Sequence, residues 1–426
     1  MKNKVNNQLK QIASLGLLKY CYSKYLSHQK TILYYLLFPF FLIYYVVLIV
    51  RYKNIRFGKI NISRIGHFIQ NPALYCAEKE LGYHSKYTDF FFYSPQKTVS
   101  NAPLFNIWKR TLNLNYLNYF IVKIDRLFNG NKNEIITTHI DSNGLFEKTS
   151  PPFQFNTVEI SLANQQLKKL NIQNKQFVCL LVREAKYLES LYKNNTPSID
   201  QYRNCSISNY IDGIHFLTKK NITVIRMGNH IQNTLTLNTK NYIEYEKEGD
   251  QTKLLDIYLP SKCRYFISCG SGIDALSGAI FKNESLHINY MCTGLQVWDS
   301  KSIIIFKKLW LKNKKRYMSL KEMLITKASC FVTSNDYAKM GIEVIENSPS
   351  EILDAIKEKE ARIENSWIET KEDIELQNKF WTIYKKYKIA HNSETCHKNC
   401  ELQHQQTFRA KIGTKFLKNN LWILDE

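Results

Sequence analysis

The sequence predicts an α/β protein with two Rossmann-like domains, preceded by an N-terminal hydrophobic membrane segment. Three observations lead to this prediction. The chain has 426 residues, more than one ordinary core needs, which favours two domains. Short apolar runs alternate with amphipathic helical patterns, which is typical of a mostly parallel sheet covered on both faces. Residues 31–50 carry no charge and are long enough to cross a bilayer of about 30 Å.

The uncharged run is TILYYLLFPFFLIYYVVLIV. A long basic segment precedes it and no small-residue cleavage site follows, so it does not read as a cleaved signal peptide. Basic residues on both sides leave its orientation open and suit anionic lipid headgroups. Pro39 and the tyrosines leave room for a re-entrant or interfacial anchor, and a buried core helix is the alternative. We expect residues 1–57 to be a basic N-terminus containing this anchor.

The first Rossmann-like domain is expected over residues 58–160. Residues 58–82 read as strand, turn and helix, with Pro72 at a position that a first helical turn tolerates. The apolar and aromatic runs at 88–94 and 118–124 predict strands. A double proline near residue 151 marks the domain edge.

The second domain is expected over residues 165–390, where the alternation is clearer, and residues 391–426 are expected to pack back on the first domain. Both kinds of element are predicted from apolar spacing. The expected strands are 176–183, 222–228, 263–268 and 285–289. The expected helices are 160–172, 206–220, 252–260, 272–281, 348–366 and 375–387.

The formal net charge of +22 indicates an anionic partner, such as nucleic acid, an anionic membrane face or a phosphorylated substrate, unless it is a diffuse solvated surface. Arginines stand singly at strand ends rather than clustering with aromatics, which disfavours nucleic acid. Ten cysteines without framework spacing favour reduced thiols and the cytoplasm. One further group of histidines and cysteines resembles a zinc site only weakly, so we predict that this segment is a polar linker without metal. Its members are His391, Cys396, His397, Cys400 and His404.

Polar or glycine-rich residues follow four of the expected strands. Ligands of parallel α/β sheets bind beyond the carboxyl ends of the strands, so these residues are candidates for a site. They are Arg64 to His67, Arg183 with Glu184, Arg226 to Asn229, and Ser268 to Gly272. His67 is a candidate general base because a histidine titrates near working pH, although a lone histidine is more often structural. Arg203 and Asn204 stand near the start of an amphipathic helix.

The stretch CRYFISCGSG places small residues between a strand and a helix. Two hydroxyls and two glycines, at Ser268, Gly270, Ser271 and Gly272, leave backbone N–H groups able to receive an anion. The spacing fits neither a Walker loop nor the dinucleotide fingerprint, and a packing turn is the alternative. Arg226, followed by Gly228, supplies charge for a pyrophosphate unless it forms an ion pair.

Asp-x-Asp does not occur in the sequence, and its nearest equivalent, Asp373-Ile374-Glu375, begins a charged helix. A metal-chelated nucleotide site is therefore disfavoured. The ordered series RIGHFIQN, VCLLVREAKYL, YRNCSISNY, VIRMG, LDIYL, CRYFISCGSG and IENSPSEI resembles a family of bacterial surface-polysaccharide glycosyltransferases over about residues 58–420. The resemblance implies a GT-B-like fold, a nucleotide-sugar donor, a glycan or lipid-linked acceptor and no resident cofactor.

The resemblance also implies roles for individual residues. His67 and Glu184 are implied as catalytic, and Asp200 stands where the family has a histidine before its Tyr-Arg pair. The implied phosphate-binding residues are Arg226, Gly228, Ser268, Gly270, Ser271 and Gly272. The implied substrate-binding residues are Arg64, Gly66, Arg183, Arg203 and Asn204.

We therefore expect a metal-independent glycosyltransferase at the bacterial inner membrane, with its catalytic domains facing the cytoplasm. Its expected partners are a nucleotide-sugar donor, a glycan or lipid-linked acceptor and membrane lipids, and not nucleic acid. Two alternatives remain. One is transfer of another group, such as pyruvyl, to a polysaccharide. The other is a non-enzymatic basic protein that binds membranes or nucleic acid.

Overall fold

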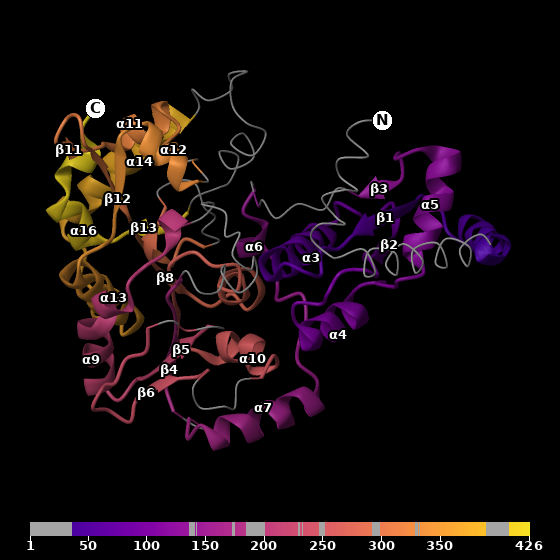
Figure 1. The fold of residues 1–426 in the computed structure, drawn as a ribbon, viewed down its shortest axis with the longest axis horizontal. Coiled ribbons are helices and arrows are strands. Elements are labelled where there is room, and N and C mark those ends of the chain that lie inside the picture. Colours follow the sequence, from indigo (N-terminus) through magenta and orange to yellow (C-terminus); the bar gives the residue numbers. More distant parts are fainter. Residues whose placement is uncertain are drawn as a thin grey trace, which may run out of the picture. The chain divides into compact units, whose positions relative to one another are not determined.

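The computed structural model describes residues 36–135, 141, 143–172, 175–184, 201–228, 231, 233–246, 252–291, 299–328, 331, 333–388 and 409–426 (Figure 1). The chain forms two compact units. The first contains Met1–Lys59, Lys86–Gln96 and Leu112–Ile136. The second contains Ile60–Ser85, Lys97–Thr111 and Thr137–Glu426. Residues 58–160 thus contribute to both units, and the expected four-part division stays a prediction.

The first unit is built on a parallel sheet with the order β2-β1-β3. Its strands are β1 (Ile55–Lys59), β2 (Thr88–Phe92) and β3 (Glu134–Ile135). Phe57 of β1 and Phe90 of β2 lie in the core with residues of helix α5 (Asn118–Asn129). Tyr45 and Leu48, from the helical residues 36–51, complete that core.

The N-terminal membrane segment expected over residues 31–50 is not supported. In the part of the chain that the structure describes, no helix is both long enough and apolar enough to span a bilayer. Residues 36–51 instead bury one face in the core of the first unit, where Tyr45 is 5% exposed. The Tyr45 hydroxyl donates to Asp125 Oδ1 at 3.0 Å, so a polar contact fixes this face against α5.

The strand expected over residues 118–124 is wrong, because these residues begin α5. Asn118, Ile121, Val122 and Asp125 are buried at spacings of three and four residues, which is the helical period. A short apolar run cannot by itself distinguish a strand from a buried helix. Here the helical spacing of buried residues continues past the apolar run to Asp125, and this continuation identifies the segment as a helix.

The second unit contains a seven-stranded parallel sheet with the order β13-β9-β8-β7-β4-β5-β6. The strands expected from apolar spacing are confirmed as β4 (Phe177–Leu181), β5 (Thr223–Met227), β7 (Phe266–Ser268) and β8 (Ser285–Tyr290). The other three are β6 (Tyr242–Glu244), β9 (Ile303–Phe306) and β13 (Lys411–Ile412). A small antiparallel sheet joins β10 (Lys308–Leu311), β11 (Arg316–Tyr317) and β12 (Ile342–Ile345).

Helices cover the parallel sheet as the strand–helix alternation predicts. In Figure 1, α9 (Ile211–Lys219) and α13 (Pro349–Ile363) lie on one side of the strands and α10 (Leu255–Lys262) on the other. The π-helical turn η3 (Leu276–Ile280) packs with α10 and α3. The other helices of this unit are α3 (Ile65–Glu80), α4 (Ala102–Thr111), α6 (Leu145–Lys148), α7 (Thr157–Lys169), α11 (Leu320–Ile325), α12 (Ser334–Lys339), α14 (Lys371–Lys388) and α16 (Thr414–Asn419).

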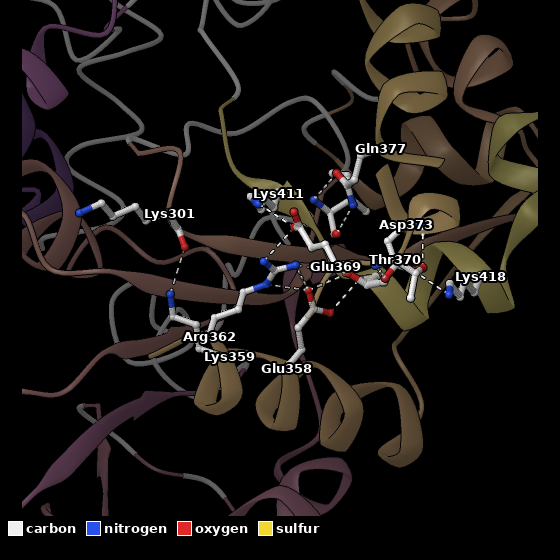
Figure 2. Close-up of polar contacts among 12 residues, drawn as sticks. Lys301, Glu358, Lys359, Arg362, Glu369, Thr370, Asp373, Gln377, Lys411 and Lys418 are labelled. Atoms are coloured by element: carbon white, nitrogen blue, oxygen red, sulfur yellow. Dashed lines mark hydrogen bonds and ion pairs between the residues drawn. The ribbon is translucent and has the colours of Figure 1, made fainter. Parts of the chain in front are cut away.

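Buried charges fasten the C-terminal elements to this unit (Figure 2). Glu358 of α13 is 1% exposed and accepts hydrogen bonds from the Thr414 backbone N–H and hydroxyl, at 2.7 and 2.9 Å. Arg362, one turn further along α13, donates to Glu358 and to Glu369. Lys418 of α16 pairs with Asp373 of α14 at 2.7 Å. These contacts hold α13, α14 and α16 together and place β13 at the edge of the sheet.

Candidate functional site

The strand order of the seven-stranded sheet defines where a ligand is expected. In chain order the first six strands are arranged 3-2-1-4-5-6, which is the doubly wound arrangement, and β13 extends it by one strand. The order reverses between β4 and β7, which pair directly. Ligands of such sheets bind beyond the carboxyl ends of the strands at this switch point. A ligand is therefore expected beside the segments that follow β4 and β7.

The loop after β7 is hydrogen-bonded to a carboxylate of the same segment, that of Asp274. Asp274 is 2% exposed, and its Oδ2 accepts the Ser268 hydroxyl at 2.7 Å and the Ser271 backbone N–H at 3.1 Å. The Gly270 N–H donates to the Ser268 hydroxyl at 3.1 Å. Burial raises the pKa of Asp274 to about 6, although these hydrogen bonds favour the charged form. The carboxylate of Asp274 thus occupies donors that the sequence predicts for a phosphate.

The same loop packs against the start of α3. A Cβ built on Gly272 would lie 2.6 Å from Gly66 Cα and 2.8 Å from the Gly66 nitrogen. Arg64 is the N-cap residue of α3 and is exposed, and His67 follows two residues into the helix. The pKa of His67 is lowered by burial and by the charge of Arg64, while a hydrogen bond with Asn71 opposes the shift. His67 is therefore neutral at pH 7, the form that accepts a proton.

The segments after β4 and before α9 meet the β7 loop. The Arg183 backbone N–H donates to Cys269 Sγ at 2.9 Å, and its carbonyl oxygen accepts the Cys205 N–H at 2.9 Å. Arg203 donates to the Gly270 carbonyl oxygen. Backbone and side-chain contacts thus bring Arg183, Arg203 and the β7 loop together at the switch point.

Arg226 lies at the end of β5 and is 1% exposed. Its guanidinium donates to Glu184 Oε2 and Glu244 Oε1, both at 2.9 Å, and to the Asn233 carbonyl oxygen at 2.6 Å. Two buried carboxylates therefore face one cation. Arg226 fixes the carboxyl ends of β4, β5 and β6 and offers no net positive charge to a phosphate.

A cavity of about 460 Å³ opens beside this triad in the second unit. Its wall combines residues after β4, β5 and β9 with residues of β12 and of the segment that precedes α9. The lining residues are Glu184, Gln201, Tyr202, Asn204, Cys205, Ser206, Asn233, Lys307, Val344 and Glu346. We call this the switch-point cavity. Its place at the carboxyl edge of a doubly wound sheet makes it the candidate ligand site.

Lys307 carries the positive charge of the cavity. It is 2% exposed, and its Nζ donates to the Tyr202 and Asn204 carbonyl oxygens at 3.0 and 2.5 Å. Among the described residues, no carboxylate lies within ion-pair distance of this ammonium group. The two acidic residues of the wall have other partners. Glu184 binds Arg226, and Glu346 accepts the Ser206 N–H at 3.0 Å.

A buried ammonium that is hydrogen-bonded only to neutral carbonyl groups remains electrostatically uncompensated. An anionic ligand in the switch-point cavity would supply that compensation. Lysine commonly binds phosphate groups, to which it presents a point charge. The cavity can therefore hold a phosphorylated molecule against Lys307.

The structure brings most of the sequence-predicted site residues to one edge of the sheet, but only some of them line the cavity. Glu184 and Asn204 line the cavity, whereas Arg226 lies behind its wall. Gly228, with φ of +139°, turns the chain after β5. Asp200 and the His391–His404 group lie outside the described residues. The assigned roles of all these residues stay predictions.

Sequence reasoning missed Lys307 and Asp274. The run SIIIF before Lys307 is the signal of a buried strand, so Lys307 also stands at a strand end. Asp274 reads as an ordinary acidic residue in a first helical turn, and only the fold turns its carboxylate into the loop. No family model, curated protein or solved structure matches the chain.

Proposed function

We propose that this chain is a transferase that uses a nucleotide-activated sugar, with the donor phosphates bound against Lys307 in the switch-point cavity. The observation that carries the proposal is the buried Lys307 ammonium, which faces a cavity of about 460 Å³ and has no described carboxylate partner. The doubly wound strand order supports it, because this order is used widely to bind nucleotides at the switch point.

The proposal places the phosphates beside Lys307 rather than on the β7 loop. The N–H groups of Gly270 and Ser271 already bind Ser268 and Asp274, and Gly272 packs on Gly66. In this arrangement the loop packs against the start of α3 and does not hold the phosphates. The Lys307 ammonium stabilises the negative charge that develops on the leaving nucleoside diphosphate. Low-dielectric surroundings strengthen this electrostatic interaction.

His67 is the proposed general base for an acceptor hydroxyl. Its lowered pKa leaves the imidazole neutral at pH 7, and the helix that carries it begins against the β7 loop. Glu184 is a positioning residue in this proposal, since it accepts hydrogen bonds from Arg226 and from the Asn233 N–H. The acceptor is a glycan or a lipid-linked glycan, as the sequence resemblance implies.

Ligand binding to the full-length protein tests the proposal. UDP, GDP, CMP and inorganic pyrophosphate are titrated calorimetrically in the presence of EDTA. We expect at least one nucleotide to bind more tightly than pyrophosphate. Lys307→Met should weaken that binding about ten- to a hundred-fold, the loss of a charge-assisted contact worth about 1.5–3 kcal/mol.

Lys312→Met is the matched control, because it removes the same charge from a side chain that is 60% exposed. This control should bind the nucleotide as the parent does. Equal losses in both variants would show that only the overall charge matters. Failure of every nucleotide to bind the parent protein, or full binding by Lys307→Met, would overturn the proposal.

A further inference from the structure

The first unit has a cavity of its own, with a volume of about 230 Å³. Its wall combines residues of the helical segment 36–51, of β1, of α5 and of the segments that precede β1 and β3. The lining residues are Tyr45, Ile49, Tyr52, Asn54, Ile55, Asp125, Asn129 and Asn133. We call it the Asp125 cavity, after the acidic residue of its wall.

Asp125 is 1% exposed, and its two carboxylate oxygens are used unequally. Oδ1 accepts the Tyr45 hydroxyl at 3.0 Å and the side-chain N–H groups of Asn129 and Asn133 at 2.8 and 2.9 Å. Oδ2 has no hydrogen-bond partner among the described residues. Because Asp125 lines the cavity, a ligand bound there can donate to this oxygen.

The charge of Asp125 also lacks a counterion. Its three hydrogen-bond donors are neutral, and burial together with Asp125 raises the pKa of Tyr45 to about 12. Among the described residues, no lysine, arginine or histidine lies within ion-pair distance of this carboxylate. Arg126, the next residue of α5, pairs with Glu134 instead. A bound cation would offset the cost of burying this uncompensated carboxylate.

The chemistry of the wall favours an organic cation over a metal ion. Calcium and magnesium take several oxygen ligands, usually from more than one carboxylate. In the part of the chain that the structure describes, no group of three or more acidic, histidine or cysteine residues could hold a metal. Asn129 and Asn133 direct their N–H groups, not their oxygens, toward Asp125.

Aromatic and apolar side chains form much of the remaining wall. The Tyr45 ring stacks on Phe128 with centroids 6.1 Å apart, and the Tyr52 ring meets Phe90 edge-on at 5.6 Å. These contacts fix the rings beside the carboxylate. Tyrosine rings attract cations, and aliphatic carbon packs well on such a wall.

We propose that the Asp125 cavity binds a small primary alkylammonium ion, whose N–H donates to Asp125 Oδ2 and whose carbon chain contacts Ile49 and Ile55. The cavity has half the volume of the switch-point cavity, which suits a small amine rather than a nucleotide. The inference concerns the first unit alone and does not depend on the ligand of the switch-point cavity.

Ligand binding to the full-length protein at pH 7 tests the proposal. n-Butylammonium, n-butanol and n-butyrate have the same carbon chain and differ in the charge and hydrogen bonding of the head group. Each is titrated and followed by saturation-transfer NMR. We expect n-butylammonium to bind with a Kd of about 1 mM or tighter, which is within reach of so small a ligand. It should bind at least about tenfold more tightly than n-butanol, and n-butyrate should not bind.

Asp125→Asn removes the charge but keeps an oxygen that can accept the three hydrogen bonds of Oδ1. An amide N–H₂ then takes the place of Oδ2 and cannot accept from an ammonium group. This variant should bind n-butylammonium about ten- to a hundred-fold more weakly. Glu134→Gln is the matched control, because it removes the same charge from the same unit and does not line the cavity. It should bind as the parent does.

A second pair of variants tests where the amine binds. Ile49 lines the cavity and is 48% exposed, so Ile49→Lys places an ammonium group of the chain itself near Asp125 without replacing a buried side chain. This group should compete with n-butylammonium and abolish its binding. Val50→Lys is the control, since Val50 is 80% exposed and does not line the cavity. It should leave the affinity unchanged.

Three results would each overturn the proposal. The first is that n-butylammonium does not bind the parent protein. The second is that n-butanol binds equally well, because any neutral donor, water included, would then satisfy Oδ2. The third is full binding of n-butylammonium by Asp125→Asn or by Ile49→Lys. If Asp125→Asn does not fold, the three probes and the Ile49→Lys and Val50→Lys pair are sufficient for the decision.

Discussion

Gly272 and Gly66 meet through their backbones, so that a methyl group on Gly272 would lie 2.6 Å from the Cα of Gly66. This contact places the start of α3 against the loop that follows β7. Because the atoms in the way belong to the backbone, they cannot rotate aside as the end of a side chain can. Both glycines are therefore required by close approach.

Gly272→Ala should lower the free energy of unfolding by about 1–3 kcal/mol, the range for overpacking a close contact. Gly213→Ala is the control, since its added methyl would meet Ile356 Cδ1 at 2.3 Å, the mobile end of a side chain, and alanine favours the helix. Urea unfolding of both variants provides the comparison. A larger loss for Gly213→Ala would contradict the backbone argument.

Arg226→Ala should destabilise the second unit by about 3–5 kcal/mol, because it leaves the buried carboxylates of Glu184 and Glu244 without their cation. The loss should be smaller at pH 5 than at pH 8, since the uncompensated carboxyl groups can then take up protons. Denaturant unfolding at the two pH values measures this. A loss that does not change with pH would mean that missing packing, and not charge, causes it.

Asp274→Asn should change how stability depends on pH. The folded-state pKa of Asp274, about 6, lies above the ordinary value of 3.8. A raised pKa means that the folded chain holds this proton more tightly, so the associated stability is complete below pH 4 and is lost as the pH rises through 6. The full effect is on the order of 3 kcal/mol. Asparagine does not titrate and removes this dependence.

The measurement is the difference in unfolding free energy between parent and Asp274→Asn at intervals from pH 4 to pH 7.5. The difference should shift in favour of the variant as the pH rises across this range. Other titrating groups cancel, because they are common to both proteins. A difference that stays constant with pH would show that Asp274 has an ordinary pKa in the folded chain.

The sequence predicts the parallel sheet of the second unit well and the first unit poorly. Strands such as QFVCLLVR and ITVIRMG have continuous apolar runs that are buried on both faces, and β4 and β5 confirm them. The runs at 31–50 and 118–124 are also rich in apolar residues, but their hydropathy does not reveal which residues they pack against. The Tyr45–Asp125 hydrogen bond joins the first run to the helix that contains the second, and it is a long-range contact that neither local pattern contains.

The candidate site shows the same limit. Strand-end positions identify Arg183, Glu184, Arg226 and the β7 loop correctly as neighbours of the carboxyl edge. Their partners decide what each can do, and those partners are distant in sequence or hidden by ordinary local patterns. Glu244 neutralises Arg226, and Asp274 fills the loop. The positions of the site residues can therefore be predicted from the sequence, whereas the charges that surround each of them are known only once the fold is known.

His67 provides the last prediction. If it deprotonates the acceptor, His67→Ala should lower kcat at least a hundred-fold while nucleotide affinity changes less than twofold, because the base acts on the acceptor and not on the donor. The lowered pKa of His67 also places the acid limb of the parent's pH–rate profile below pH 6.5, the ordinary value. His84→Ala is the matched control, since His84 contacts Glu78 at 2.8 Å on the far part of α3. Turnover and calorimetric affinity, measured on both variants, separate a catalytic His67 from a structural one. A structural histidine would reduce thermal stability and both parameters together.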